Sequence, residues 1–420
     1  MPSWMYFVLA LAGLLAGYCV YGAIVEKVFG PDPNRPTPAC KMPDGVDYVE
    51  MSPTKVFLIQ LLNIAGLGPV FGPILGALYG PIALLWVVIG CVFAGAVHDY
   101  FSGMLSVRYN GKSVPDIVGY NLGDLIKKLM RVFAVVLLIL VGVVFVAGPA
   151  GLLSQLTGMH SMLFVAIIFA YYFLATILPV DKIIGRVYPF FAVLLVFMAV
   201  GLLGALAFKG STFYSNIEWT MHSPSGLPAW PLVFITIACG ACSGFHATQS
   251  PLMARCINNE KHGRKIFYGA MIAEGVIGLI WVTLGMSFYS DTAALAAALG
   301  PKGNAALVVN NISVELLGVF GGALAVLGVV VLPVTSGDTA FRSARLVLAD
   351  WFHIEQKSIK GRLTLCIPVL GIGAILGVGN ALGKIDYTII WRYFSWTNQT
   401  LAMIVLWAAS MYLFYEKKNY

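Results

Sequence analysis

The side chains most able to do chemistry lie inside long apolar stretches of the chain. His246 stands among Ser243, Gln249 and Ser250, and Asp99 follows an uninterrupted apolar segment. Ionisable groups are costly in a bilayer and usually mark functional sites there, and histidine titrates near neutral pH. We therefore predict that His246 binds substrate or carries a coupling proton. Asp99 either carries such a proton or only braces a neighbouring helix.

A second polar group gathers oxygen atoms on one later segment. It consists of Thr335, Ser336, Asp338 and Thr339. Hydroxyl and carboxylate oxygens are the ligands that hard cations prefer, so these residues are candidates for ion coupling. The alternative is structural, because Asp338 and Arg342 have the i,i+4 spacing of a salt bridge.

Other polar residues in apolar segments are weaker candidates. The amides of Asn398 and Gln399 could bind substrate or tie helices together, and Glu274 lies deep in its segment. Cys239 and Cys242 form a single C-x-x-C without a second pair, which favours packing. The sequence contains no H-E-x-x-H, P-loop or G-x-S-x-G motif, so we assign no catalytic residues and predict that the protein is not an enzyme.

The elements that position these residues are predicted to be transmembrane helices. Hydrophobic residues make up 59% of the 420 residues and charged residues only 11%, which is far from a soluble composition. Bilayer crossings need about 20 apolar residues each, and we count about eleven. They cover 4–25, 54–78, 81–107, 131–154, 161–180, 186–208, 229–254, 266–289, 312–341, 363–382 and 391–414.

The distribution of positive charge predicts the orientation. With the N-terminus outside, 22 of the 26 Lys and Arg residues fall in or beside the connections predicted to be cytoplasmic. Cytoplasmic loops retain these residues, so an outside N-terminus and a cytoplasmic C-terminus are expected. The net charge of +7 therefore reflects topology, and we expect the lipid bilayer, not nucleic acid, as the partner of this chain. The sequence leaves the oligomeric state open.

Two of the predicted spans are expected to be broken near the middle of the bilayer. One carries Gly66, Gly68, Pro69, Gly72 and Pro73, and the other carries Gly240, Gly244 and the pair Ser250–Pro251. Glycine and proline weaken helices, and non-helical backbone at that depth occurs only where protein buries it or it lines a cavity. We expect a half-helix to begin at Ser250–Pro251, with its free amides facing a carboxylate.

The two breaks lie five spans apart, which predicts an inverted repeat of five plus five helices. The predicted divisions are 1–53 for an N-terminal transmembrane helix and cytoplasmic loop, 54–208 and 209–414 for the two repeats, and 415–420 for a short cytoplasmic tail. Substrate is expected where the breaks meet. The predicted substrate-binding residues are Asn63, Gly66, Gly68, Ser243, Gly244, His246, Gln249, Ser250, Asn398 and Gln399.

Several long motifs on separate segments resemble the carbon starvation protein A family. They are DPNRPTPA (32–39), DGVDYV (44–49), IAGLGPVFGP (64–73), AGAVHDY (94–100), ACGACSGFHATQS (238–250), VTSGDTAFRSAR (334–345) and WRYFSWTNQTLA (391–402). The resemblance covers residues from about 15 to 405. It implies a peptide or pyruvate transporter of the amino acid-polyamine-organocation superfamily, with a leucine-transporter-like fold, in a bacterial or archaeal plasma membrane.

The resemblance also implies specific site features. A sodium ion could bind between the backbone at Ala65 and the side chains of Thr335, Ser336 and Thr339. One departure concerns Ile59 and Gln60, which stand where the family often has a histidine pair, so protonation chemistry attributed to that pair is in question here.

Together these observations predict a secondary active transporter. It would import a small carboxylate such as pyruvate, or short peptides, in the carbon starvation response, coupled to protons or sodium. No cofactor is expected apart from a coupling Na⁺ or H⁺. An ion or solute channel is the alternative, and an intramembrane enzyme is a more remote one.

Overall fold

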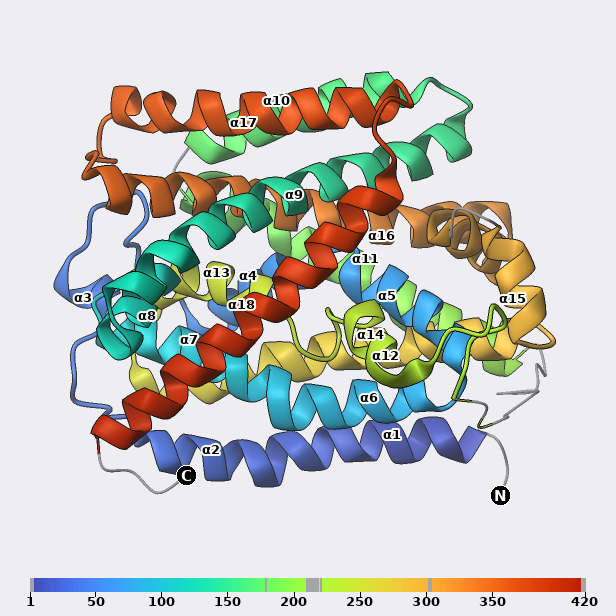
Figure 1. Cartoon of the computed structure of the whole chain (residues 1–420), viewed down its shortest axis with the longest axis horizontal. Helices are drawn as coiled ribbons and strands as arrows, with labels where there is room; N and C mark the ends of the chain where they lie inside the picture. Colours follow the sequence, from blue (N-terminus) through green and yellow to red (C-terminus); the bar gives the residue numbers. More distant parts are fainter. Residues whose placement is uncertain (1–3, 178–179, 209–218, 220, 301–303, 417–420) are drawn as a thin grey trace.

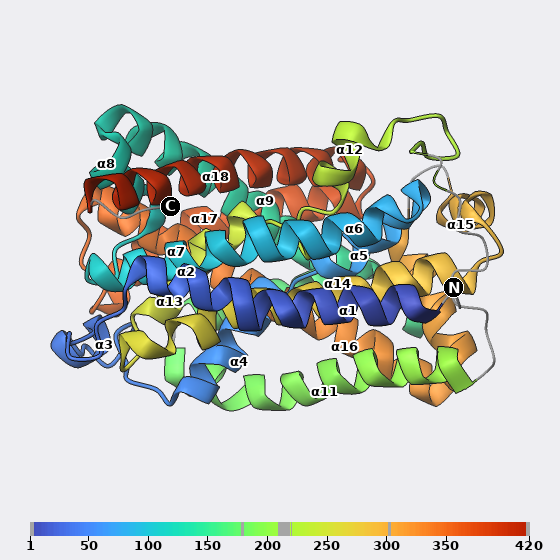
Figure 2. The ribbon, with the colours of Figure 1, turned by 90° about the horizontal axis from the view of Figure 1, so that it is seen from below.

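The chain folds into a bundle of helices that run mostly along one axis (Figure 1). The computed structural model describes residues 4–177, 180–208, 219, 221–300 and 304–416, with side chains at 177–192 and 388 left out. All regular structure in these ranges is helical. The start of α1 and the end of α18 lie at opposite ends of the bundle in both views (Figures 1 and 2), as expected for an odd number of crossings.

The described residues up to Phe208 form eleven α-helices and a few short π- and 3₁₀-helical turns. The N-terminal rod is α1 (Trp4–Ala16), a π-helical turn (Gly17–Tyr21) and α2 (Gly22–Phe29). The helices that follow are α3 (Pro38–Lys41), α4 (Pro53–Ile64), α5 (Gly68–Gly76), α6 (Ile82–Ile89), α7 (Ala96–Arg108), α8 (Val114–Leu122), α9 (Asp124–Thr157), α10 (Ser161–Ile177) and α11 (Val180–Phe208).

The second half continues with seven α-helices. They are α12 (Ala229–Thr236), α13 (Gly244–Ala254), α14 (Gly269–Phe288), α15 (Thr292–Leu299), α16 (Ala305–Phe352), α17 (Ile359–Ala381) and α18 (Tyr387–Tyr415). The longest, α16, changes direction at Gly318, whose positive φ of 72° is a conformation that glycine adopts at little cost. It packs along α9 and α11 through the middle of the bundle.

The predicted class, an all-α polytopic membrane protein, is confirmed. Six helices in the described residues are long and apolar enough to cross a bilayer, and the bent pair Pro53–Ile64 with Gly68–Tyr79 makes a seventh. The count of eleven spans, the inverted repeat and its boundaries stay predictions. Residues 178–179 of the predicted span 161–180 lie outside the described residues, and in the predicted span 186–208 the side chains of 186–192 are left out.

Two connections predicted as loops are helical instead. Residues 108–130 contain α8 and the first turn of α9, and the predicted loop 342–362 begins with the last turns of α16, which continues to Phe352. The sequence suggested a loop because Arg342 and Arg345 interrupt the apolar pattern. In the structure both arginines are buried against other segments, so the helix can continue through them.

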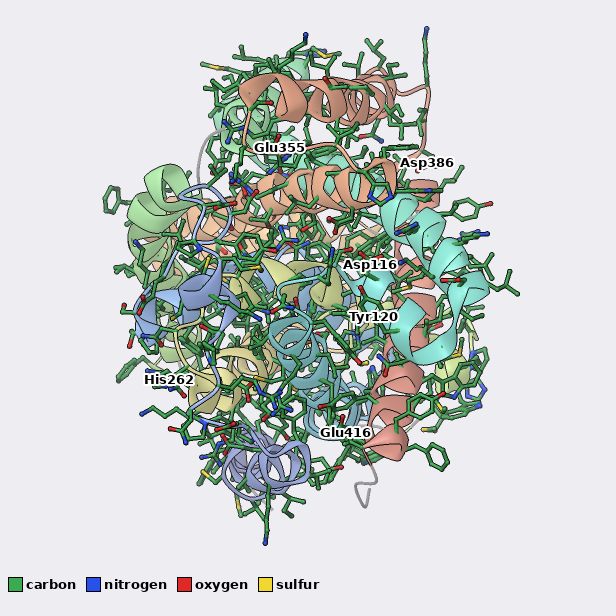
Figure 3. The ribbon with its side chains drawn as sticks, turned by 90° about the vertical axis from the view of Figure 1, so that its left-hand side faces the viewer. Asp116, Tyr120, His262, Glu355, Asp386 and Glu416 are labelled. Carbon is green, nitrogen blue, oxygen red and sulfur yellow. The ribbon has the colours of Figure 1, made fainter. Side chains whose placement is uncertain are left out.

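Polar connections gather at one end of the bundle. The connections after α2, α7, α13 and α16 lie at the same end as the end of α18 (Figure 1), and Figure 3 looks onto this end. Here the buried carboxylate of Glu260 receives two hydrogen bonds from Arg108, of 2.8 and 3.0 Å. This is the end that the charge distribution predicts to be cytoplasmic, although Lys182, Arg186, Lys417 and Lys418 lie outside the described side chains. The orientation itself stays a prediction.

Candidate functional site

The first predicted break lies between α4 and α5. The helix α4 ends at Ile64, α5 begins at Gly68, and the two axes differ by 49°. Gly68 packs against the second half of the chain: a Cβ atom on Gly68 would lie 2.1 Å from Cβ of Cys239. Only glycine allows the two segments to approach so closely, and Gly66 has the ring of Phe145 in the equivalent place.

The second break lies between α12 and α13. It extends from Ile237 to Ser243 and includes Gly240 at a φ of +88°. The prediction that a half-helix begins at Ser250–Pro251 is wrong, because α13 begins at Gly244 with Ser243 as its extended N-cap. Pro251 sits inside the helix, where it lacks an amide hydrogen, and the Ser250 hydroxyl donates to the carbonyl of His246 one turn earlier.

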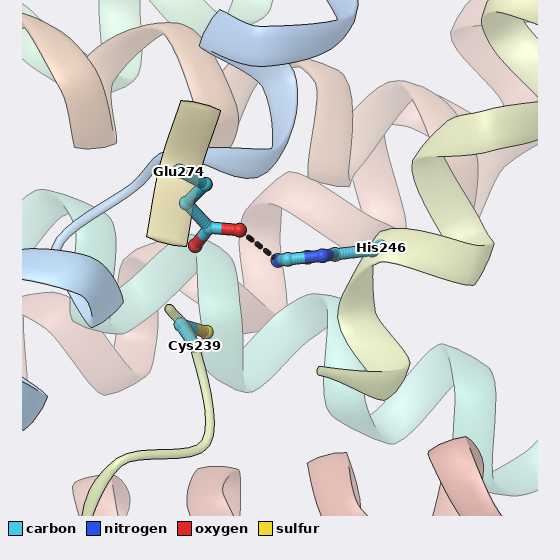
Figure 4. A group of neighbouring side chains, drawn as sticks. All are labelled: Cys239, His246 and Glu274. Atoms are coloured by element: carbon cyan, nitrogen blue, oxygen red, sulfur yellow. Dashed lines mark ion pairs between the residues drawn. The ribbon is translucent and has the colours of Figure 1, made fainter. Parts of the chain in front are cut away.

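His246 lies between two carboxylates from different helices. Its Nδ1 is 2.9 Å from Oδ2 of Asp99 on α7, and its Nε2 is 3.2 Å from Oε2 of Glu274 on α14. All three side chains have no exposed surface. Figure 4 shows the imidazole of His246 directed at the carboxylate of Glu274. The second carboxylate oxygen of Glu274 accepts a hydrogen bond from the amide of Gly240, which fixes the group to the break.

Asp99 has a second histidine beside it. Nδ1 of His98 lies 2.8 Å from Oδ1 of Asp99, so these neighbours interact although adjacent helical residues point about 100° apart. The imidazole ring of His98 is long enough to reach the carboxylate of its neighbour. Asp99 therefore links His98 and His246 in one buried network.

The charge of this network depends on Glu274. If Nδ1 of His246 donates to Asp99, an ionised Glu274 is favourable beside Nε2 only when His246 carries a second proton or a cation lies between the two atoms, whereas a neutral Glu274 could donate to Nε2. The ligand atoms of Cys239, His246 and Glu274 all lie within 4.8 Å of one another, so they could hold a transition metal ion. The 3.2 Å separation of Nε2 and Oε2 is within ion-pair range, but neither atom has a hydrogen bond to a described residue.

The predicted amides of α18 hold the second break in place. The side-chain oxygen of Asn398 accepts from the Ser243 hydroxyl at 3.1 Å and from the Phe245 amide at 2.6 Å. The Gln399 amide donates to the carbonyls of Phe234 and Cys242, both at 3.0 Å. Gly244 is also pressed against α18, because an added Cβ would lie 2.2 Å from the Asn398 carbonyl oxygen. In this arrangement the amides connect helices.

Buried polar atoms without partners collect near the first break. Neither side-chain atom of Asn63 has a hydrogen-bond partner, and the amide oxygens of Gln60 and Gln249 also have none. All three residues are fully buried on α4 and α13, which pack together. The Gln60 amide donates to Ser250. Unsatisfied buried polar groups are rare and call for a physical explanation.

The predicted oxygen cluster is split between two sets of partners. The hydroxyls of Thr335 and Ser336 donate to the carbonyl of Leu62 in α4, at 3.2 and 2.9 Å, and also to a carbonyl of their own helix. They therefore face the first broken helix one turn before Ala65. The hydroxyl of Thr339 bonds within α16.

Asp338 and Arg342 make contacts elsewhere in the bundle. Asp338 accepts from the hydroxyl of Tyr171 at 2.6 Å, and Arg342 reaches Asp47 and the carbonyl of Ala175. Asp338 thus lies on the α10 side of α16, away from the Leu62 carbonyl that Thr335 and Ser336 contact.

Several members of the site were undervalued from the sequence. Glu274 was ranked as a weak candidate, Cys239 as packing and Gln60 only as a departure from the family pattern. Their helices meet only in three dimensions, so sequence spacing gave no sign of the network. The single available signal was the occurrence of an ionisable or polar residue within an apolar span, which applies to Glu274.

The comparisons with known proteins agree with this architecture. The crystal structure of MhsT in complex with L-phenylalanine aligns with a TM-score of 0.58 and 16% identity, over 85% of this chain and 88% of that one. Mhp1, a nucleobase-cation-symport-1 family transporter, aligns with a TM-score of 0.53 and 14% identity, over 81% and 78%. The fold is therefore leucine-transporter-like.

The sequence comparisons identify the family. An uncharacterized membrane protein of Haemophilus influenzae is 49% identical over 70% of this chain and 94% of its own. The peptide transporter CstA of Escherichia coli is 25% identical over 96% and 76%, and the pyruvate/proton symporter BtsT of Escherichia coli is 27% identical over 63% and 46%. The family model described as "Carbon starvation protein CstA" matches residues 3–149 and 148–316 of this chain. The chain is a member of the carbon starvation protein CstA family.

Proposed function

We propose that this protein is a secondary transporter that moves a small carboxylate or a short peptide together with protons. The observation that carries the proposal is the position of His246 between Asp99 and Glu274, on three helices that meet at the second break. The names of two relatives, a peptide transporter and a pyruvate/proton symporter, support the same substrate classes.

The buried network is suited to take up and release a proton. With His246 protonated, the positively charged ring donates to Asp99 and lies 3.2 Å from the Glu274 carboxylate; without that proton, Nε2 and an ionised Glu274 oxygen face each other as two acceptors. The deprotonated arrangement is unfavourable in a site that excludes water, so loss of the proton should loosen the contact between α13 and α14. Proton binding would then be coupled to the relative position of the two helices.

The unpartnered amides offer a place for the substrate. Asn63, Gln60 and Gln249 together expose donor and acceptor atoms to the interior between α4 and α13. A carboxylate or a peptide group supplies complementary atoms, and amide side chains can bind either one without burying a fixed charge. On α13, Gln249 lies about one turn after His246. On α4, Gln60 and Asn63 lie within two turns of the first break. The amides are therefore close to both the titratable network and the break, as coupling between substrate and proton requires.

Protons are favoured over sodium by the hydroxyl contacts. Thr335 and Ser336 already donate to Leu62 and to their own helix, an arrangement that satisfies them without an ion. The carbonyl of Leu62 and the hydroxyl lone pairs could nevertheless act as oxygen ligands. Sodium is therefore the second coupling ion that a transport assay has to test.

Transport in proteoliposomes tests the proposal. The purified protein is reconstituted, and uptake of labelled pyruvate and of labelled dialanine is measured under an inward proton gradient, an inward sodium gradient, or neither. We expect concentrative uptake under the proton gradient alone, its loss with a protonophore, and no effect of a metal chelator. Uptake that ignores the proton gradient would refute proton coupling, and loss of uptake with the chelator would assign the three-ligand site to a metal.

A matched pair of variants locates the coupling group. His246→Ala removes the central member of the network, whereas His262→Ala removes a partly exposed histidine at the end of the bundle (Figure 3). Only the first variant should abolish proton-driven uptake. Both should keep the thermal stability needed for purification, measured in the same detergent.

A further inference from the structure

Three buried arginines surround one buried aspartate near the end of α13, and a fourth, Arg362, lies close to one of them, Arg345. Arg255 is the residue after α13, Arg342 and Arg345 lie on α16, and Arg362 lies on the first turn of α17; each is at most 6% exposed. Asp47, in the segment between α3 and α4, is 3.4 Å from Arg342 and 3.6 Å from Arg345. The cluster lies outside the network of His246.

The positive charge of this cluster is incompletely matched. Nε of Arg345 and both Nε and Nη1 of Arg362 are buried without a hydrogen-bond partner. Arg255 donates to the carbonyl of Gly111, and Nη1 of Arg345 donates to the Gln356 amide. These neutral partners satisfy single N–H groups and compensate no charge. Buried guanidinium groups are costly unless they are paired.

Other carboxylates nearby do not remove the imbalance. Asp44 and Asp350 act electrostatically on Arg255. One oxygen of Asp44 is occupied by three backbone amides, those of Val46, Asp47 and Tyr48. Asp350 is partly exposed. Among the described residues, Asp47 is the fully buried carboxylate that contacts this cluster, and it pairs with Arg342 and Arg345.

The arginine cluster is connected to the substrate site along α13. His246 and Arg255 are nine residues apart, or roughly 13 Å along the helix at about 1.5 Å per residue. A small cavity of about 10 Å³ lies beside this stretch of α13, lined by Thr248, Arg255 and Ser343 together with apolar residues such as Leu252 and Val347. Arg255 of the cluster therefore lines a space next to the same helix that carries His246.

We propose that this arginine cluster is a second, transient binding site for the carboxylate of the transported substrate. The inference rests on the proposed transport function and adds a place where the substrate anion binds between the site at His246 and the end of the bundle predicted to be cytoplasmic. The unpartnered N–H groups of Arg345 and Arg362 bind the carboxylate through charge-assisted hydrogen bonds. Asp47, which is 3.6 Å from Arg345, competes for that guanidinium group and so promotes release.

The proposal is tested by substituting an arginine that would bind the substrate carboxylate and, separately, the aspartate that competes with it. Efflux of pyruvate is measured in membrane vesicles with the predicted cytoplasmic face inside, at several internal concentrations. Arg362→Gln should raise the half-saturating internal concentration by about tenfold, the loss of roughly one charge-assisted hydrogen bond. Asp47→Asn should lower that concentration and slow maximal efflux, because the substrate no longer has a competitor. Lys360→Gln, an exposed charge change two residues from Arg362, should leave both values unchanged.

The chemistry of the substrate separates anion binding from a purely structural role. Dialanine and dialanine amide differ in the terminal carboxylate, so Arg362→Gln should impair transport of the acid and spare the amide. Equal losses for both compounds, or an Asp47→Asn variant with unchanged half-saturation, would overturn the proposal. Absence of transport by the wild-type protein would instead refute the proposed function. Arg362→Lys, which keeps the charge, should retain most of the wild-type efflux.

Discussion

Replacement of Glu274 by glutamine is the most direct test of the buried network. At 3.2 Å, the attraction between a protonated His246 and the Glu274 carboxylate is about 5 kcal/mol with an effective dielectric constant of about 20. Glutamine removes the charge but keeps the size and the acceptor for the Gly240 amide. It therefore resembles the protonated acid, and the network loses most of the attraction that distinguishes its two protonation states.

We expect Glu274→Gln to impair proton-driven uptake of pyruvate and to leave the exchange of pyruvate across the membrane nearly intact. If even half of that attraction is lost, the change corresponds to roughly 2.7 kcal/mol, or about a hundredfold. We expect uptake of labelled pyruvate against its gradient to fall by at least that factor in Glu274→Gln, while exchange of labelled for unlabelled pyruvate stays within about threefold of wild type.

The assay uses the same proteoliposomes with and without an imposed proton gradient. Glu315→Gln, a carboxylate on the exposed surface of α16, is the matched control and should behave as wild type in both assays. Concentrative uptake by Glu274→Gln at the wild-type level would refute the reasoning, because the network would then carry no coupling proton.

Four further outcomes are expected. Asp99→Asn should reduce proton-driven uptake at least tenfold with little change in the yield of folded protein, measured by size exclusion. Thr335→Ala should change the sodium dependence of uptake only if sodium is the coupling ion. Glu260→Gln leaves the half-buried Arg108 without its charge partner and should cost about 2 kcal/mol, seen as a lower midpoint of thermal unfolding. Burial raises the pKa of Asp47, but the arginines around it outweigh that effect and hold the pKa below its usual value. Asp47 therefore stabilises the fold above the ordinary carboxyl range, and this contribution should fade from roughly pH 5 downward and be absent from Asp47→Asn.

Apolar periodicity and charge distribution were sufficient to predict the helical membrane fold. The breaks at Gly66 and Gly240 were also predicted, because glycine and proline gather at these positions within otherwise apolar spans. The helical continuation of α16 through Arg342 and Arg345 was not predicted, because the spans were identified from uninterrupted apolar sequence and these arginines interrupt it. A prediction from composition ends a span at a charged residue. It cannot include the contacts of Asp47 with Arg342 and Arg345, which come from a distant part of the sequence.

The candidate site was predicted in part. Asp99 and His246 were selected because each is an ionisable residue in an apolar span, and the structure brings them into contact. The pairing with Glu274 could not be predicted, since it depends on how α7, α13 and α14 pack around the second break. The start of α13 was misplaced because Ser250–Pro251 has the sequence of a cap, whereas its surroundings allow a proline within the helix.

The contact between the two broken segments has a mechanical consequence. Gly68 faces the side chain of Cys239, whereas a Cβ on Gly72 would lie 2.8 Å from the carbonyl oxygen of Thr236, so at Gly72 the two segments touch backbone to backbone. A backbone contact has no side-chain rotamers that could make room for a larger residue. Any side chain at Gly72 therefore requires α5 and the end of α12 to move apart as whole segments.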